Sequence, residues 1–220
     1  MLEALWITVK LAAVTTLWLL VLGTPLAWWL SRTRSNLSHA IEAVVALPLV
    51  LPPTVLGFYL LIAFAPQSTL GQAWQALTGE RLAFSFSALV IGSILYSLPF
   101  VVQPLQAAFR QLPEGLLQAA ASLGASPLDR AASVVWPLCR PSFIAAASLG
   151  FAHTVGEFGV VLMIGGNIPG ETQVLSIALF DRVESLDFDA AHSLALGLML
   201  FSLVTLFLLY RSSGRWSVRL

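Results

Sequence analysis

Long apolar segments alternate with short polar ones along the whole chain. A helix needs about 20 residues to cross the roughly 30 Å hydrocarbon core of a bilayer. Five segments reach that length, namely residues 6–30, 43–65, 83–106, 142–164 and 190–210. We therefore predict an all-α integral membrane protein, a polytopic bundle of about five transmembrane helices that forms one membrane domain over residues 1–220.

The second apolar segment is predicted to be irregular. Pro48, Pro52 and Pro53 lie in its middle and Gly57 follows them. Each proline removes a backbone donor and disfavours a continuous helix, so the segment must kink or break. The carbonyl groups released by a break need partners within protein or in a water-filled cavity. This segment is therefore expected to face protein rather than lipid.

The longest polar stretch between apolar segments, residues 112–137, is predicted to form two short helices, and we call it the island. Pro113 suits the first turn of a helix, where its missing N–H costs nothing. Leucine and alanine residues then repeat at three- and four-residue spacing as far as Gly124. Glycine readily adopts the left-handed conformation that ends many helices. The first helix is therefore expected to end near Gly124.

The second helix of the island begins with a capping sequence. Ser126 is predicted to be the N-cap and Pro127 the first helical residue, with Asp129 near the free N–H groups of the first turn. We expect this helix to continue until Pro137 interrupts it.

The polar segment 165–189 between the last two spans is predicted to combine a turn with a short amphipathic helix. Its first part, 165–171, reads GGNIPGE, and the following residues place Val174, Ile177 and Ala178 on one side of a helix. The segment could cap an exit or contact an extracytoplasmic partner, and a solvated connector explains the pattern equally well.

The composition places the chain in a bilayer. Hydrophobic residues make up 58% of it and charged residues 10%, against about 25% charged residues in soluble domains. The first segment carries Glu3 near its start and is too long for a signal peptide, so we expect it to be retained. The one cysteine, Cys139, excludes an internal disulfide and a cysteine-based metal site. The net charge of zero implies no nucleic acid as a partner.

The basic residues predict the orientation, because positive charge is retained on the cytoplasmic side. With five spans, three of the eleven basic residues, Lys10, Arg81 and Arg182, fall on or towards one side. Acidic side chains gather on that side, namely Glu3, Glu80, Glu171, Asp181, Glu184, Asp187 and Asp189. The opposite side carries Arg32, Arg34, Arg110, Arg130, Arg140, Arg211, Arg215 and Arg219. The N-terminus is therefore expected outside, in the periplasm, and the island and the C-terminus in the cytoplasm.

No set of catalytic residues is visible. The three histidines lie far apart, and the sequence has no HExxH, GxSxG or Walker motif. We therefore expect no enzymatic activity, metal or cofactor on this chain, and no nucleotide site. This also argues against a membrane-embedded enzyme, which needs a clustered nucleophile, metal or acid–base pair.

His153 and Glu157 are four residues apart within the fourth span, where ionisable groups are costly and usually functional. On one helical face they could form a structural pair that fixes helix packing, or belong to a gate at a point where the span can bend. The candidate pathway or gate residues are His153, Thr154, Gly156, Glu157, Phe158 and Gly159.

Arginine and lysine are absent from the middle of the spans. An anion crossing here would meet hydroxyl groups such as those of Ser148 and Thr154, together with backbone N–H groups. We therefore expect a separate capture protein to set the selectivity. A secondary transporter or channel, the main alternative, would need more paired charges within the spans.

The island resembles the coupling element of bacterial ABC importer permeases. Gln118-Ala119-Ala120, Gly124, Val134 and Pro137 match the spacing of the signature E-A-A-x-x-x-G-x₉-I-x-L-P, with Gln118 in place of Glu, Val134 of Ile and Trp136 of Leu. The resemblance implies that the island seats in a groove of a cytoplasmic ATPase subunit. The candidate coupling residues are Gln118, Ala119, Ala120, Gly124, Ser126, Pro127, Val134 and Pro137.

Further motifs resemble the molybdate permease branch, of which sulfate permeases are close relatives. They are GTPLA at 23–27, LPLVLPPTV at 47–55, HTVGEFG at 153–159 and GGNIPGET at 165–172. The resemblance implies a complex in the bacterial inner membrane with two permease copies, two ATPase subunits that bind ATP and Mg²⁺, and a periplasmic oxyanion-binding protein. The implied cargo is molybdate, with tungstate or sulfate as alternatives.

Overall fold

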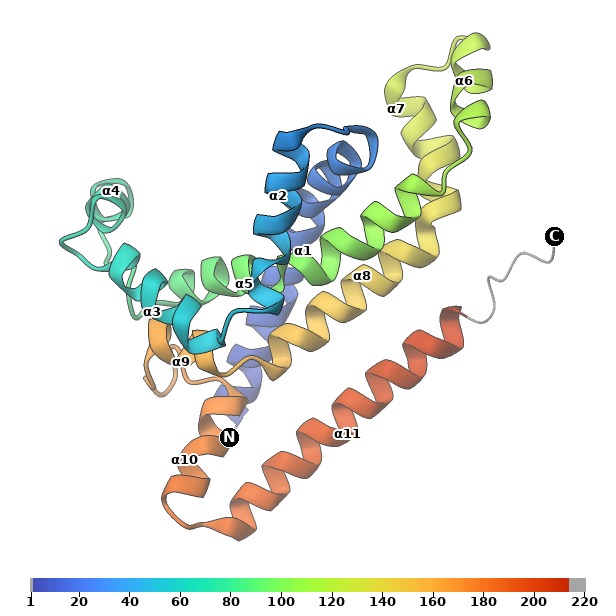
Figure 1. Ribbon diagram of the computed structural model, residues 1–220. Helices are drawn as coiled ribbons and strands as arrows, with labels where there is room; N and C mark the ends of the chain where they lie inside the picture. The colour runs from blue at the N-terminus through green and yellow to red at the C-terminus, as the bar shows by residue number, and fades with distance from the viewer. Residues whose placement is uncertain (1, 214–220) are drawn as a thin grey trace.

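Four long helices dominate the computed structural model, which describes residues 2–213 (Figure 1). They are α1 (Leu2–Arg32), α5 (Phe86–Arg110), α8 (Trp136–Gly156) and α11 (Phe188–Ser213). The other helical elements are α2 (Asn36–Ala46), η1 (Leu47–Leu49), α3 (Pro53–Phe64), α4 (Thr69–Thr78), α6 (Glu114–Ser122), α7 (Pro127–Arg130), η2 (Ala131–Val135), α9 (Gly159–Gly165) and α10 (Leu175–Glu184). No strand occurs within residues 2–213, so the all-α prediction is confirmed.

Helices α1, α5 and α8 pack against one another and form the centre of the bundle. A small residue lets α1 approach α5 closely, because a Cβ atom on Gly23 would lie 3.3 Å from Val101. One buried apolar cluster lies around Leu19, Val101 and Leu105, and a second lies around α3, α5 and α9. Helix α11 contacts α8 and α10 and lies along the outside of the bundle (Figure 1).

The structure contains four helical stretches long and apolar enough to cross a membrane within the described residues, together with one broken pair. The four are Leu2–Arg32, Phe86–Arg110, Pro127–Gly156 and Phe188–Leu208. The pair is formed by the regions Asn36–Leu49 and Pro53–Phe64, which are bent by 110° relative to each other. The structure has five membrane spans if the two helical regions of that pair cross the membrane together as one span.

The break in the second span falls at the predicted prolines. Pro48 lies in the 3₁₀ turn η1, Pro52 has an extended backbone and Pro53 begins α3. Gly57 faces protein, because a Cβ atom there would lie 2.8 Å from the Cβ of Met163 on α9. Phe58 and Tyr59 of the same helix are exposed on this chain, so the contact with α9 covers one face of α3.

The fourth span differs from the prediction in two ways. It does not continue as one helix over 142–164, because α8 ends at Gly156, Glu157 has an extended backbone, and α9 restarts at Gly159. We call residues 156–159 the corner.

In addition, Pro137 does not interrupt the second island helix. Its missing N–H is accommodated by the wider π turn η2, which ends immediately before α8.

The polar segment 165–189, between the last two spans, contains the predicted helix. Helix α10 covers Leu175–Glu184, with Ile177 buried, after a turn region that spans 166–174. Helix α4 was not predicted. The signal was present, because Ser68 caps its start through the N–H of Gly71 and Gly79 ends it in the left-handed conformation.

Candidate functional site

The first candidate site is the island, and local hydrogen bonds fix its turn. Gly124 has a φ of +84°, as predicted. The N–H of Gly124 donates to Ala121 at 3.0 Å and the N–H of Ala125 donates to Ala120 at 3.0 Å. This pair of bonds is the Schellman motif, which satisfies the last carbonyl groups of a helix. Pro113 precedes α6 as its N-cap, one position before the predicted first turn.

The second island helix begins with a complete capping box. The Ser126 hydroxyl accepts a bond from the Asp129 N–H at 3.2 Å, and the Asp129 carboxylate accepts one from the Ser126 N–H at 3.1 Å. The Ser126 hydroxyl also donates to this carboxylate, and these two bonds from Ser126 lower the pKa of Asp129. The predicted roles of Ser126, Pro127 and Asp129 in helix capping are confirmed.

The tip of the island exposes apolar side chains. Leu116, Leu123 and Leu128 are 47%, 88% and 82% exposed, respectively. Gln118 and Ala119 on α6 are exposed as well, and Ala120 is half-buried. Leucines that project from a polar, well-capped turn are typical of a surface that another protein covers.

The island is joined to the bundle at both of its ends. At its start, Glu114 pairs with Arg32 of α1 at 3.7 Å. At its end, α7 continues through η2 into α8, so that the helical run Pro127–Gly156 has 30 residues. Such a run is about 45 Å long at about 1.5 Å per residue. Val134 lies within η2 and Pro137 at the start of α8.

The second candidate site is at the other end of this run, around the buried carboxylate of Glu157. Ser93 donates to Oε2 of Glu157 at 2.5 Å, and Ser97 donates to Oε1 at 2.9 Å, both from α5. Ser176 of α10 donates to the backbone carbonyl of Glu157. The Glu157 side chain is fully buried, so its carboxyl group is surrounded by hydroxyl groups and shielded from solvent.

His153 lies beside this network. Its Nδ1 is 2.8 Å from the Ser97 hydroxyl and 3.7 Å from Oε1 of Glu157. The imidazole ring stacks on Phe100 with 3.9 Å between ring centroids and contacts Tyr96 at 4.9 Å. His153 and Glu157 therefore meet as predicted, but they do not share a helical face, because the backbone leaves the helix between them.

The two helix breaks meet at a cavity of about 470 Å³. Pro53 and Thr54 line it from the break in the second span, and Tyr96 lines it from α5. The corner packs closely against the first break, because a Cβ atom on Gly159 would lie 2.9 Å from that of Pro53. Five of the predicted pathway residues line the cavity, namely His153, Gly156, Glu157, Phe158 and Gly159.

Thr154 is the exception among the predicted pathway residues. Its hydroxyl donates to the Gly150 carbonyl at 2.9 Å and lies 3.3 Å from the Ser97 hydroxyl, and its side chain is buried against α5.

The serines that hold Glu157 were not predicted. Their spacing contained a usable signal, because Ser93 and Ser97 are four residues apart in a charge-free span and so share a helical face.

The fold is similar to that of a chain in a solved transporter structure. It superposes, with a TM-score of 0.77 and 16% identity, on a chain in the crystal structure of a bacterial ABC transporter involved in the import of the acidic polysaccharide alginate, covering 98% of this chain and 79% of that one. The family model described as binding-protein-dependent transport system inner membrane component matches residues 20–218. The chain belongs to this family and is an inner membrane component of a transport system.

Similar proteins indicate a branch within the family. The chain is 58% identical over 211 residues to the molybdenum transport system permease protein ModB of Azotobacter vinelandii, covering 96% of this chain and 93% of that protein. It is 30% identical over 213 residues to the sulfate transport system permease protein CysT of Escherichia coli, covering 97% of this chain and 76% of that protein.

Proposed function

We propose that this chain is the permease subunit of an ATP-driven importer that carries molybdate across the inner membrane, as a single membrane domain. The observation that carries this proposal is the 58% identity to a molybdenum transport permease along 96% of the chain. The 30% identity to a sulfate permease makes sulfate the weaker alternative, and tungstate is the expected second cargo because its oxyanion is nearly the same size.

The exposed tip of the island is the proposed seat for a cytoplasmic ATPase subunit. Leu123 and Leu128 are large apolar side chains that gain from being covered, and the capped turn holds them in a fixed arrangement. ATP and Mg²⁺ would bind to that ATPase subunit. Among the family signature positions, Gln118 is exposed and can donate and accept hydrogen bonds there without a charge.

The helical run from Pro127 to Gly156 is the proposed route by which the ATPase acts on the membrane path. Movement of the island would displace α8 along its whole length, because the π turn η2 keeps the two helices continuous. That helix ends at the corner, beside the cavity between the two helix breaks. Nucleotide-driven movement at one end would therefore open or close the path at the other.

The corner suits an oxyanion cargo because the carboxylate of Glu157, which lines the cavity, is engaged by hydroxyl groups of α5. Both oxygens of Glu157 accept hydrogen bonds from serines of α5, and the side chain is fully buried. An anion in the cavity would meet His153, Thr54 and backbone groups instead. We propose that a second copy of the chain completes the path and that a periplasmic oxyanion-binding protein delivers the cargo.

The proposed orientation places the island and the end of α11 in the cytoplasm and the N-terminus in the periplasm. In support, α1 and α11 end towards the side of the bundle that carries the island, whereas α10 and the start of α1 lie on the other side (Figure 1). Arg32, Arg110 and Arg130 lie at the island side. Arg215 and Arg219, which contributed to the prediction, lie outside the described residues.

Uptake of radiolabelled molybdate by proteoliposomes tests the function. The chain is reconstituted with its ATPase and binding protein, with ATP inside the vesicles. We expect accumulation that requires ATP, that excess tungstate abolishes and that excess sulfate leaves largely intact. If excess sulfate suppresses accumulation as strongly as excess tungstate does, the cargo class would be reassigned to include sulfate. Uptake that needs an ion gradient and no ATP would contradict the importer and favour the secondary transporter.

A further inference from the structure

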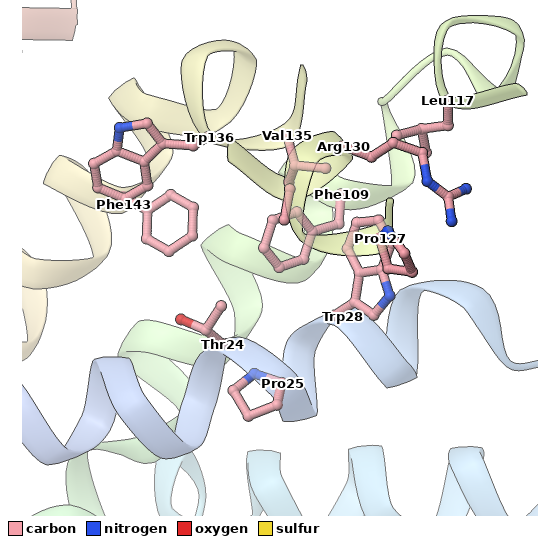
Figure 2. A pocket seen from close by; sticks show the side chains of 11 residues that line it. Thr24, Pro25, Trp28, Phe109, Leu117, Pro127, Arg130, Val135, Trp136 and Phe143 are labelled. Carbon is pink, nitrogen blue, oxygen red and sulfur yellow. The ribbon is translucent and has the colours of Figure 1, made fainter. Parts of the chain in front are cut away.

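A second cavity, of about 510 Å³, lies where the island meets the bundle. It is distinct from the cavity at the corner and has no part in the proposed transport path. Figure 2 shows its walls: Trp136 and Phe143 face it from one side, Trp28 and Phe109 from the other, and Thr24 and Pro25 form its base. The walls come from α1, α5 and α8 and from the island elements α6, α7 and η2, and they are mostly apolar and aromatic.

One charged side chain lines this cavity. Arg130, the last residue of α7, extends from it towards Leu117 (Figure 2). Its Nε atom is buried and has no hydrogen-bond partner among the described residues. Arg32, nearby on α1, differs in this respect, because it already pairs with Glu114 at 3.7 Å and stacks on Trp28. A buried N–H without an acceptor is unfavourable, and Arg130 as a lining residue gives the cavity a positive charge that an anionic group would complement.

The position of the cavity indicates the class of ligand. It lies beside the last turns of α1 and the first turns of α8, where tryptophans gather as they do at a membrane surface. Trp136 is 52% exposed, and the next outward-facing residues of α8, Leu138 and Ile144, are 52% and 39% exposed. The cavity therefore adjoins apolar surface that is suited to lipid. Basic pockets of this kind between transmembrane helices bind anionic lipid head groups.

We propose that this cavity binds one anionic phospholipid, with an acyl chain among the aromatic rings and the phosphate accepting hydrogen bonds from Arg130. The lipid would fill the space between α1 and the α7–α8 run and would brace the island against the bundle. The ligand is a phospholipid and not a free anion, because the walls are mostly apolar and aromatic and gain most from covering an acyl chain.

The test measures which lipids remain bound to the purified complex. The complex is reconstituted in nanodiscs that contain equal amounts of phosphatidylglycerol and phosphatidylethanolamine, extracted in mild detergent, and analysed by native mass spectrometry. An arginine near an anionic lipid contributes ~1 kcal/mol, which corresponds to about a fivefold preference. We therefore expect about fivefold more phosphatidylglycerol than phosphatidylethanolamine to be retained, and Arg130→Gln should abolish this preference.

Two further variants separate this site from general surface charge and from misfolding. Arg34→Gln removes a positive charge from an exposed position outside the cavity, and it should keep the preference. Arg130→Lys should keep part of it, because the charge remains. Equal retention of both lipids by the unmodified complex would overturn the proposal, as would an unchanged preference in Arg130→Gln. Release of the lipid by millimolar inorganic phosphate would also overturn it and assign the site to a free anion.

Discussion

The two ends of the helical run Pro127–Gly156 are built in opposite ways. At the island, the bonds that fix the turn join residues three to five apart, and the side chains at its tip are exposed. At the corner, Glu157 is held by Ser93 and Ser97, which are 64 and 60 residues away, and its side chain is buried.

This difference indicates a division of roles. A turn held by its own local bonds can be displaced as a rigid unit without losing the bonds that define it. A corner held by distant partners cannot move without exchanging some of them, so it has a small number of alternative packings. Local construction therefore suits the end that receives force, and long-range construction suits the end that switches.

Glu157→Ala should have the largest effect, because it removes the acceptors of two buried serine hydroxyls. We expect a loss of about 3 kcal/mol in the free energy of unfolding and loss of molybdate uptake. Thermal unfolding in detergent and uptake by proteoliposomes measure the two effects. Glu171→Ala, at an exposed position, is the control. If Glu157→Ala and Glu171→Ala unfold at the same temperature, the serine network does not stabilise the corner.

Gly159→Ala tests the contact between the two helix breaks. The new Cβ would lie 2.9 Å from the Cβ of Pro53, so one of the breaks must shift. Overpacking of this kind costs about 1–3 kcal/mol. Gly156→Ala is the matched control, because a Cβ there meets nothing within 4 Å. Thermal unfolding of the two variants side by side gives the difference. If Gly156→Ala is as destabilising as Gly159→Ala, close packing is not the cause.

Gly124→Val tests the island without touching the bundle. Gly124 has a φ of +84° and open space around it, so valine adds backbone strain of ~1–2 kcal/mol and no clash. We expect normal assembly but ATP hydrolysis that is no longer linked to uptake. Both rates are measured in the same proteoliposomes. Gly115→Ala, also in open space, should behave as wild type. Normally coupled hydrolysis in Gly124→Val would remove the turn from the coupling mechanism.

Ser126→Ala should have the smallest effect, because the two hydroxyl bonds that it removes are exposed and both join Ser126 to Asp129. Loss of an N-cap costs about 1 kcal/mol, and we expect faster amide hydrogen exchange in α7 with no change at the corner. Ser122→Ala serves as the comparison, because this serine bonds back to Gln118 within α6 and caps nothing. Exchange that also accelerates around Glu157 would show that the two ends are not independently stabilised.

The sequence by itself determined the features that depend on neighbouring residues or on bulk composition. It predicted the apolar spans, the proline break before α3, and the left-handed Gly124. The capping box of Ser126 and Asp129 was predicted as well. These follow from solvation and backbone sterics, which act within a few residues.

Only the tertiary structure decided how the fourth span is built. The sequence indicated a point where this span can bend, at residues 156–159, but its apolar pattern through 142–164 could not decide whether the helix stops there, because hydrophobicity does not distinguish a helix from a buried turn. The turn is stabilised by Ser93, Ser97 and Ser176, which lie on other helices. The continuity across Pro137 likewise depends on a π turn. Contacts between residues far apart in the chain are set by packing, and packing is known only when all the helices are in place.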